Sequence, residues 1–344
     1  MRDHEVSVVI PVYRGARTLE PLLAEIAVLA EGATSTDGHR WRVVETVLVF
    51  DHGSDGSDAV IRRLAEQYDF VRPVWLSRNF GQHSATLAGM SATTAEWIAT
   101  IDEDGQHDPA LIGALLDAAL ARSAPLVYAR PTNAPPHGWL RNSASRAAKR
   151  VVAGLLPGAG SPQFQSFRLM TGEIGRSVAG YAGPNVYLDV ALGWVVPRVA
   201  TADVRLREEG APSGYSLGRL IGHFWRLVLS SGTRGLRIVS VIGAVTALAG
   251  FALALLFIVQ RLIGVDLPEG WTSTMVVLLV ATGFILMSLG VVAEYLGMAV
   301  NMAMGRPAYL TLADPENGPL GRARSQAAPR GGDDLSDRRG TRAP

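Results

Sequence analysis

The chain has 344 residues, and its 32 lysines and arginines nearly balance its 31 aspartates and glutamates, which gives a formal net charge of +1. That balance excludes a protein driven mainly by bulk attraction to nucleic acid. There is no cysteine, which excludes disulfides, thiolate metal sites and a cysteine nucleophile. Apolar residues make up 48% and charged residues 18%, so the chain is too apolar for a disordered protein and slightly apolar for a soluble one.

The N-terminal half alternates expected strands with expected helices. Continuous apolar, β-branched runs predict strands that are buried on both faces, and such strands alternating with helices predict an α/β domain with a doubly wound, mostly parallel sheet. The expected strands are Val6–Val12, Val43–Phe50, Val71–Leu76, Trp97–Ile101 and Leu126–Ala129, and the expected helices are Thr18–Leu29, Ser57–Gln67, His83–Thr93 and one that begins at Asp108-Pro109.

Polar clusters follow the second, third and fourth strands, at Asp51–Gly56, Ser77–Gln82 and Asp102–Gln106. Ligands of such sheets bind at the carboxyl ends of the strands, so these clusters predict one site rather than three ordinary turns. Asp102 and Asp104 point the same way in an extended stretch, where both carboxylates face one Mg²⁺ or Mn²⁺. A metal-bridged diphosphate is the implied ligand. The absence of GxxxxGK[ST] excludes a P-loop nucleotidase, and the absence of GxGxxG after the first strand argues against a dinucleotide-binding dehydrogenase.

Two long stretches, Ile238–Gln260 and Gly270–Ala293, carry no Asp, Glu, Lys or Arg. Each is long enough to cross a bilayer as a helix, and the short connection between them predicts a transmembrane hairpin. Buried helices of a soluble core are the alternative, but these rarely lack charge for so long. Arginines gather beside the two outer ends, which predicts that the N-terminal domain and the C-terminal tail are cytoplasmic: Arg219, Arg226, Arg234, Arg237, Arg306, Arg322 and Arg324.

Two further stretches combine apolar residues with basic edges, at His137–Leu156 and Tyr215–Leu229. We expect helices in the membrane interface, with packing against the sheet as the alternative. These features divide the chain into an α/β domain (1–212), a juxtamembrane interfacial helix (213–235), two transmembrane helices (236–297), a cytoplasmic juxtamembrane segment (298–313) and a disordered tail (314–344).

Several motifs together resemble a known family. The segments VSVVIPVY, FDHGSDGS, LSRNFGQHSATLAGM and TIDEDGQHDP, with the C-terminal EYLG and RPAY, are similar to family-two inverting glycosyltransferases of the GT-A fold. Within that family they resemble polyprenyl-phosphate glycosyltransferases, such as dolichyl-phosphate-mannose-synthase-like enzymes and bacterial undecaprenyl-phosphate glycosyltransferases. The similarity covers about residues 5–310. No QxxRW motif is present, which makes a processive, polymer-extruding synthase a poor match.

The resemblance implies a role for each matching position. Pro11, Tyr13 and Asp51 would line the nucleoside pocket. Asp102 and Asp104 would hold the metal and flank the diphosphate. Other substrate contacts would come from Asn79, Gln82 and Gln106, and from the acceptor-side turn with Ser213 and Tyr215. Arg205, Arg207 and Asp104 would take part in catalysis beside the phosphates.

The sequence departs from the family pattern at three positions. His52 stands where the family usually has a second Asp, Gly214 replaces a Lys in the acceptor-side turn, and Gly235 replaces a Pro. The acceptor-side turn therefore lacks one basic residue beside the expected phosphate, and position 52 lacks the second carboxylate of the family.

The expected reaction is sugar transfer from a nucleoside diphosphate sugar to a polyprenyl phosphate of the undecaprenyl type, at the cytoplasmic face of the plasma membrane. A phosphate monoester is already charged and needs no strong general base, whereas a hydroxyl acceptor does. Asp189 is the best candidate base, with a surface or helix-end carboxylate as the alternative. Arg168 either approaches the acceptor phosphate or pairs with a carboxylate.

Two other functions stay open at the sequence level. One is a membrane glycosyltransferase that uses a lipid-linked hydroxyl as acceptor, and the other is a catalytically silent membrane scaffold. The expected partners are the sugar donor, the lipid phosphate and membrane lipid, without nucleic acid. The family resemblance adds a homo-oligomer, often a tetramer, and the small residues Gly243, Ala247 and Gly250 permit close helix packing in the membrane.

Overall fold

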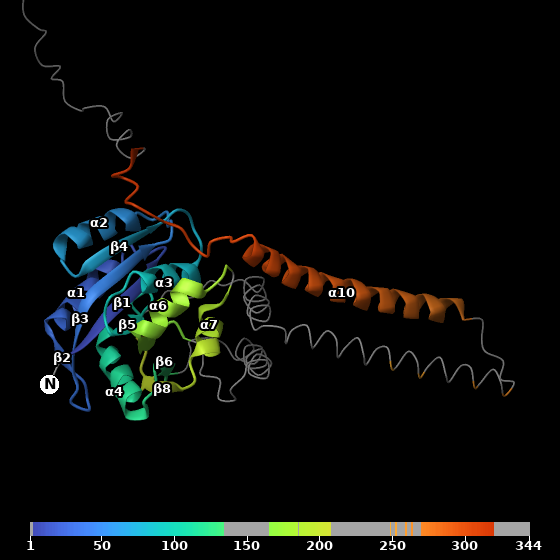
Figure 1. Cartoon of the computed structure of the whole chain (residues 1–344), viewed down its shortest axis with the longest axis horizontal. Coiled ribbons are helices and arrows are strands. Elements are labelled where there is room, and N and C mark those ends of the chain that lie inside the picture. The colour runs from blue at the N-terminus through green and yellow to red at the C-terminus, as the bar shows by residue number, and fades with distance from the viewer. Residues whose placement is uncertain are drawn as a thin grey trace, which may run out of the picture.

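A computed structural model of the chain describes residues 3–133, 165–184, 186–207 and 270–319, with isolated positions between 248 and 263. It consists of an α/β body from which one long helix, α10, projects (Figure 1). The strands are β1 (His4–Val12), β2 (Ala33–Thr34), β3 (Arg40–Phe50), β4 (Val71–Leu76), β5 (Trp97–Thr100), β6 (Leu126–Pro131), β7 (Arg168–Thr171), β8 (Val199–Val204) and β9 (Thr311–Leu312). The helices are α1 (Leu19–Glu31), α2 (Ser57–Gln67), α3 (Gln82–Ser91), α4 (Ile112–Arg122), α6 (Gly172–Tyr181), α7 (Leu188–Val195) and α10 (Trp271–Ala303).

The strands form one mixed sheet in the order β8-β6-β7-β5-β1-β3-β4-β9, and β2 pairs with β3. At the centre, β5, β1, β3 and β4 are parallel neighbours. The antiparallel pairs involve β7, which lies between β5 and β6, and the short strands β2 and β9. The expected parallel arrangement is therefore confirmed for the centre of the sheet, whose strands present their carboxyl ends at a single edge.

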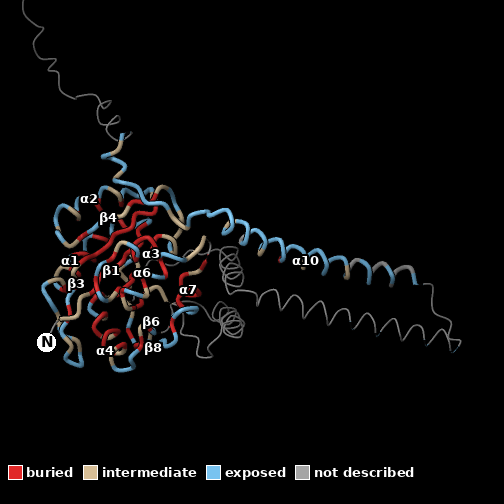
Figure 2. Tube along the Cα trace, in the orientation of Figure 1, coloured by how far each residue is buried: buried red, intermediate tan, exposed pale blue. Residues whose placement is uncertain are grey.

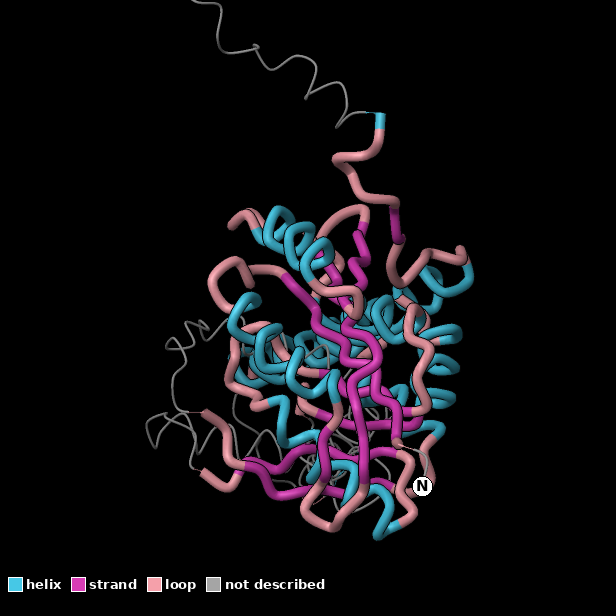
Figure 3. Tube along the Cα trace, turned by 90° about the vertical axis from the view of Figure 1, so that its left-hand side faces the viewer, coloured by secondary structure: helices cyan, strands magenta, loops and turns pink. Residues whose placement is uncertain are grey.

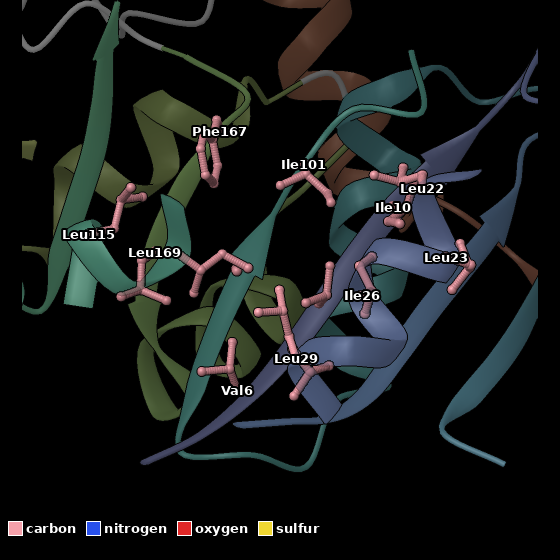
Figure 4. Close-up of a cluster of buried hydrophobic side chains, with 14 of the residues drawn as sticks. Val6, Ile10, Leu22, Leu23, Ile26, Leu29, Ile101, Leu115, Phe167 and Leu169 are labelled. Atoms are coloured by element: carbon pink, nitrogen blue, oxygen red, sulfur yellow. The ribbon is translucent and has the colours of Figure 1, made fainter. Parts of the chain in front are cut away.

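The helices cover both faces of the sheet (Figure 3). Alternate residues of β1 belong to different apolar clusters, because successive strand side chains point to opposite faces. Val8 and Ile10 lie in the cluster under α1, α2 and α4, whereas Val9 lies in the one under α3, α6 and α7. Figure 4 shows side chains of the first cluster, and Figure 2 shows that buried residues concentrate in the body. The sheet is therefore a rigid, doubly covered platform.

Local sequence explains where the helices begin and which face they bury. The Asp108 side chain accepts a hydrogen bond from the backbone N–H of Ala110 at 2.9 Å, and Pro109 occupies the first helical position. The turn Pro109–Leu111 is a 3₁₀ turn that leads into α4, so the expected helix start is confirmed. The buried residues of α1 recur at helical spacing and face the sheet: Leu19, Leu22, Leu23, Ile26 and Leu29.

The helix α10 carries the candidate membrane span Val280–Ala303, which is long and apolar enough to cross a bilayer. Its apolar side chains are largely exposed, in contrast to those of the body (Figure 2). One expected transmembrane helix thus has a counterpart in the structure. The other expected span, Ile238–Gln260, and the expected interfacial helices His137–Leu156 and Tyr215–Leu229 fall almost wholly outside the described residues.

After α10 the chain returns to the body. Strand β9 pairs antiparallel with the end of β4, and the backbone N–H of Ser77 donates to the carbonyl of Leu310 at 2.8 Å. Asp314 then accepts hydrogen bonds from the Arg62 guanidinium at 2.9–3.1 Å. Described structure therefore continues past residue 313, where the composition places the start of a disordered tail. The Arg62 guanidinium also pairs with Glu316 at 3.2 Å, and the expected tail beyond residue 319 lies outside the described residues.

Candidate active site

The loops at the carboxyl ends of β1, β3, β4 and β5 are joined to one another by hydrogen bonds. The carboxylate of Asp51, after β3, accepts hydrogen bonds from the backbone N–H groups of Phe80 at 2.7 Å and Gly81 at 2.8 Å, after β4. The side chain of Gln82 in turn donates to Asp102 Oδ1, after β5, at 2.6 Å. The polar clusters that the sequence places at one edge therefore form one continuous rim.

Asp51 is almost completely buried beneath this rim. Burial raises the pKa of its carboxyl above the ordinary value, against the two backbone N–H donors that favour the charged form. Both of its oxygens are engaged by the loop after β4. In the structure Asp51 thus orders the segment that carries the exposed Asn79, while its place beside a nucleoside stays a prediction.

Asp102 and Asp104 lie on the loop that follows β5. Both oxygens of Asp102 accept hydrogen bonds, one from Gln82 and one from the hydroxyl of Ser166. Asp104 is exposed, and its Oδ1 accepts a hydrogen bond from the backbone N–H of Gln106 at 3.0 Å. Asp102 is thus held in place by its neighbours, whereas the Asp104 carboxylate faces outward.

The donor set fits a divalent cation that is shared with a substrate. Within the described ranges, no group of three or more His, Asp or Glu side chains is arranged to hold a metal ion. Mg²⁺ is commonly bound in this way, by one or two carboxylates together with substrate phosphates rather than by an all-protein cage. Asp102 and Asp104 supply oxygen ligands of the kind that Mg²⁺ and Mn²⁺ prefer.

Glu103, between the two aspartates, was not expected as a site residue. Its carboxylate accepts hydrogen bonds from the backbone N–H of Tyr13 at 2.8 Å and of Arg14 at 2.9 Å. Burial, together with the nearby charges of Asp55 and Asp102, raises its pKa to about 7 against the two backbone N–H donors, which favour the charged form. The structure places Glu103 and Asp104 in a turn rather than in the extended stretch that is expected for Asp102 and Asp104, so no alternation in the sequence marks this role. Glu103 joins the loop after β1 to the loop after β5.

The loops after β1 and β3 touch through their backbones. A Cβ atom placed on Gly53 would lie 1.6 Å from the carbonyl oxygen of Tyr13, so only glycine fits there. His52 adopts a left-handed conformation, with φ of 56°. Its ring centroid lies 5.5 Å from that of Phe50. Pro11 is buried at the end of β1, whereas Tyr13 stays 41% exposed and leaves an aromatic face at the rim.

Arg168 and Asp189 form a buried ion pair below the rim. The Arg168 guanidinium donates to Asp189 Oδ1, and the hydroxyl of Tyr128 donates to the same oxygen at 2.8 Å. The two charged side chains are only 4% and 6% exposed. The structure therefore brings together two residues for which the sequence suggested separate roles, and of the two interpretations of Arg168 it matches the pairing with a carboxylate.

The remaining arginines follow β8. The Arg207 guanidinium pairs with Glu25 at 2.9–3.0 Å and with Asp108 at 3.2 Å, while its backbone N–H donates to the carbonyl of Gln106 at 3.1 Å. Arg207 thus fixes the end of the Asp102–Gln106 loop, with its own charge already balanced by carboxylates. Arg205 is exposed at the carboxyl end of β8. Ser213 and Tyr215 lie outside the described residues.

Comparisons with known proteins agree with this geometry. Residues 7–183 match the family described as "Glycosyl transferase family 2". The chain is 30% identical over 327 residues to an undecaprenyl-phosphate 4-deoxy-4-formamido-L-arabinose transferase of Sodalis glossinidius, covering 93% of this chain and 97% of that one. It is 31% identical over 309 residues to the protein of the same name from Klebsiella pneumoniae (strain 342), covering 89% and 92%.

Solved structures resemble the chain more distantly. A glucosyl-3-phosphoglycerate synthase from Mycobacterium tuberculosis, in complex with Mn²⁺, uridine-diphosphate-glucose and phosphoglyceric acid, is 18% identical with a TM-score of 0.48, covering 67% of this chain and 79% of that one. The mannosyl-3-phosphoglycerate synthase from Rubrobacter xylanophilus is 17% identical with a TM-score of 0.48, covering 68% and 74%. The matched residues include the central strands of the sheet, their strand-end loops and Arg168, so the chain belongs to glycosyl transferase family 2 and is a glycosyltransferase.

Proposed function

We propose that the protein transfers a sugar, with inversion, from a nucleoside diphosphate sugar to a polyprenyl phosphate of the undecaprenyl type at the cytoplasmic face of the plasma membrane. The relatives that match over most of the chain carry undecaprenyl phosphate in their names. The observation that carries the proposal is the rim itself, where Asp102 and Asp104 follow β5 on the loop that Glu103 joins to the exposed Tyr13.

Asp102 and Asp104 would hold a Mg²⁺ or Mn²⁺ ion together with the donor diphosphate. When bound, such an ion stabilises the negative charge of a departing diphosphate. Tyr13 would lie against the nucleoside base, with its ring presented by the loop that Glu103 fixes. Gln82 and Gln106 would face the donor near its phosphates. The protein contributes preorganised groups at the point where charge develops, and in many enzymes such groups account for most of the rate enhancement.

A lipid phosphate suits this site better than a lipid-linked hydroxyl. A hydroxyl acceptor requires a general base, and Asp189 is the strongest sequence candidate for it. In the structure the Asp189 carboxylate is buried and paired with Arg168 and Tyr128, which leaves it poorly placed to accept a proton from a substrate. A phosphate monoester is already ionised near neutral pH and acts as a nucleophile without such help.

The membrane segment brings the rim to its acceptor. The described chain on either side of the membrane region binds the same sheet, because β9 after α10 pairs with β4. We therefore propose an even number of crossings, with the run Ile238–Gln260 as the second span beside α10. Both the catalytic domain and the tail would then lie in the cytoplasm, as the flanking arginines predict.

The test is a donor screen with the full chain in isolated membranes. Radiolabelled nucleotide sugars are supplied with Mn²⁺, with and without added undecaprenyl phosphate, and label is counted in the lipid phase. We expect one donor to label lipid only when undecaprenyl phosphate is present, with release of the nucleoside diphosphate. The anomeric configuration of the product, compared with that of the donor, tests inversion.

Matched variants make this screen specific to the site. Asp104→Asn is expected to lower transfer at least about a hundredfold, because removal of a charged metal ligand costs several kcal/mol in the transition state. Asp69→Asn alters an exposed carboxylate between α2 and β4, at the opposite ends of the strands, and should leave transfer unchanged. No transfer with any donor, or label on a lipid that carries only hydroxyl groups, would contradict the proposal.

A further inference from the structure

The hydroxyl of Ser166 contacts Asp102 from a part of the chain far away in sequence. Strands β5 and β7 are antiparallel, with Trp97 opposite Thr171 and Thr100 opposite Arg168. Continued beyond both strand ends, this register puts Ser166 opposite Asp102. The Ser166 hydroxyl donates to Asp102 Oδ2, while Gln82 donates to Oδ1. The plane of the Asp102 carboxylate is therefore fixed by a donor at each oxygen.

The backbone of Ser166 is itself held by buried groups. Its carbonyl oxygen accepts a hydrogen bond from the hydroxyl of Thr100 at 2.5 Å and a longer one from Arg168 Nε at 3.5 Å. The same Nε donates to the Thr100 hydroxyl at 3.1 Å. The other side of the guanidinium binds Asp189. A continuous set of contacts thus runs from the buried Arg168–Asp189 pair to the Asp102 carboxylate.

Stability alone is a weak explanation for this arrangement. Two charges that leave water incur a large desolvation cost, and well-packed apolar residues of similar volume often serve a fold as well or better. What an apolar pair would lack is the directional contact of Arg168 with Thr100 and with the Ser166 carbonyl. The charged pair therefore does something that packing alone does not, in that it fixes the strand end that presents Ser166.

We propose that Ser166 is a positioning residue that orients the Asp102 carboxylate toward the cation and the donor diphosphate, and that the Arg168–Asp189 pair holds Ser166 in register. Each oxygen of a carboxylate has two lone pairs. With one lone pair of each taken by Ser166 and Gln82, the remaining ones are fixed in direction before the cation arrives. The inference rests on the proposed function, because it needs Asp102 to act at a metal-bound diphosphate.

The chemistry predicts which measurement will change. Hydrogen bonds to a metal-binding carboxylate orient it, and loss of such a partner typically costs about 10–100-fold in metal affinity or activity. Loss of the Ser166 hydroxyl should thus lower the affinity for Mn²⁺ and raise the Mn²⁺ concentration that transfer requires. It should leave the KM for undecaprenyl phosphate nearly unchanged, because the acceptor does not touch Asp102 in this scheme.

The experiment compares Ser166→Ala, Ser166→Cys and Ser166→Thr in the full chain. Cysteine keeps the size but donates weakly, and threonine keeps the hydroxyl. Ser91→Ala is the control, because the Ser91 hydroxyl donates to the carbonyl of Ala88 at an exposed helix end. The first measurement is Mn²⁺ binding without donor or acceptor, followed by the loss of the free-ion electron paramagnetic resonance signal. The others are the Mn²⁺ concentration for half-maximal transfer, kcat, KM and the thermal midpoint.

We expect Ser166→Ala and Ser166→Cys to weaken Mn²⁺ binding and to raise the half-saturating Mn²⁺ concentration about tenfold or more. Ser166→Thr and Ser91→Ala should stay within about twofold of the wild type. If Ser166→Ala does not fold, Ser166→Cys and Ser166→Thr decide the question. Wild-type metal binding in Ser166→Cys, or failure of Ser166→Thr to restore it, would overturn the proposal.

The same design separates this proposal from the proposed function. Mn²⁺ binding is measured without sugar transfer and without a lipid acceptor. A wild-type protein that transfers no sugar would refute the transferase reaction while the metal-binding comparison still reports on Ser166. A wild-type protein that transfers sugar, with Ser166→Ala equal to it in every measurement, would refute the positioning role alone.

Discussion

Single residues at the rim carry charge in different environments. Asp104 is exposed, Asp102 is held by neighbouring donors, and Glu103 is partly buried between them. The turn at Glu103 and Asp104 accompanies this division: Glu103 reaches the backbone of the loop after β1, whereas Asp104 stays at the surface. A short run of acidic residues thus has two environments: Asp102 and Asp104 lie at the rim, and Glu103 binds the backbone of the loop after β1.

The first prediction concerns the pH dependence of stability. The pKa of Glu103 is about 7 in the folded protein and 4.5 for an unperturbed glutamate, so the folded state keeps a proton that the unfolded state has released between these values. The contribution of Glu103 is complete below pH 4.5 and is lost as the pH rises through about 7, at up to about 1.4 kcal/mol per pH unit.

Glu103→Gln mimics the protonated form and should flatten this slope. The measurement is the thermal midpoint of detergent-solubilised, metal-free protein from about pH 5 to about pH 8, an interval chosen to contain the titration. Asp69→Asn serves as the control at an exposed carboxylate. A wild-type midpoint that rises with pH across this interval, or an unaltered slope in Glu103→Gln, would count against a raised Glu103 pKa.

The second prediction distinguishes a structural Asp189 from a general base. Asp189→Asn leaves the Arg168 charge buried without its carboxylate, and removal of one partner of a buried pair costs about 3–5 kcal/mol. We expect a large fall in the thermal midpoint. The double variant Arg168→Met with Asp189→Leu should recover much of the loss, because it removes both charges. A normal thermal midpoint with abolished turnover would instead support Asp189 as a base.

The acidic residues of the rim can be predicted from the local sequence, but the side chains that hold them in place cannot. Asp102 and Asp104 are predictable because they directly follow an apolar strand, a pattern visible within a few residues. The contact of Ser166 with Asp102 depends on the antiparallel pairing of β7 with β5, which connects segments far apart in the sequence. The sequence leaves Arg168 with two interpretations, an acceptor phosphate or a carboxylate, and only the tertiary structure shows that its partner is Asp189.

Among the elements, the short strand β9 is unusual because it follows α10 in the chain but belongs to the sheet of the body. β9 has only two residues, yet it attaches the chain after α10 to β4, whose own carboxyl end leads into the Ser77–Gln82 loop. A strand of two residues is too short to show an apolar periodicity, so neither β9 nor β2 can be predicted from the sequence. The long central strands are predictable because burial on both faces leaves a continuous apolar run.

The third prediction tests this attachment. Arg62 is 18% exposed, binds Asp314 through several hydrogen bonds and stacks 4.8 Å from the ring centroid of Trp75. Arg62→Ala should lower the free energy of unfolding by about 1–3 kcal/mol, because the hydrogen bonds to a charged partner are lost. It should also speed proteolysis between residues 309 and 319.

Arg63→Ala is the matched control for this prediction. Arg63 pairs with Glu20, but both side chains are more than half exposed, at 56% and 65%. Exposed pairs contribute about 0–1 kcal/mol, so its stability and its proteolysis should resemble those of the wild type. Equal effects of the two substitutions would show that the bond between Arg62 and Asp314 does not hold the segment in place.

At the scale of the whole molecule, the chain leaves the sheet and comes back to it. The described residues up to 207 and those from 309 onward belong to one body, while α10 projects from it (Figure 1). If α10 crosses a membrane, a chain that returns to the same body must cross it again. The uncharged run before α10 has the length for that second crossing.

The fourth prediction uses the absence of cysteine from the sequence. Single cysteines are introduced at Ile263, in the connection between the expected spans, and at Asn317, after β9. In right-side-out vesicles, a membrane-impermeant maleimide should label Ile263→Cys and spare Asn317→Cys. Inverted vesicles should give the reverse pattern. Labelling of both positions from one side would contradict the hairpin.

The pairing of β9 with β4 also determines how the catalytic body can be isolated. A shortened chain that ends before the membrane region loses β9, so the backbone groups at the end of β4 become an open sheet edge. Open edges recruit strands from other molecules and promote aggregation. A peptide that spans residues 307–319, added in trans, would occupy this edge by strand addition and keep the shortened enzyme monomeric and soluble.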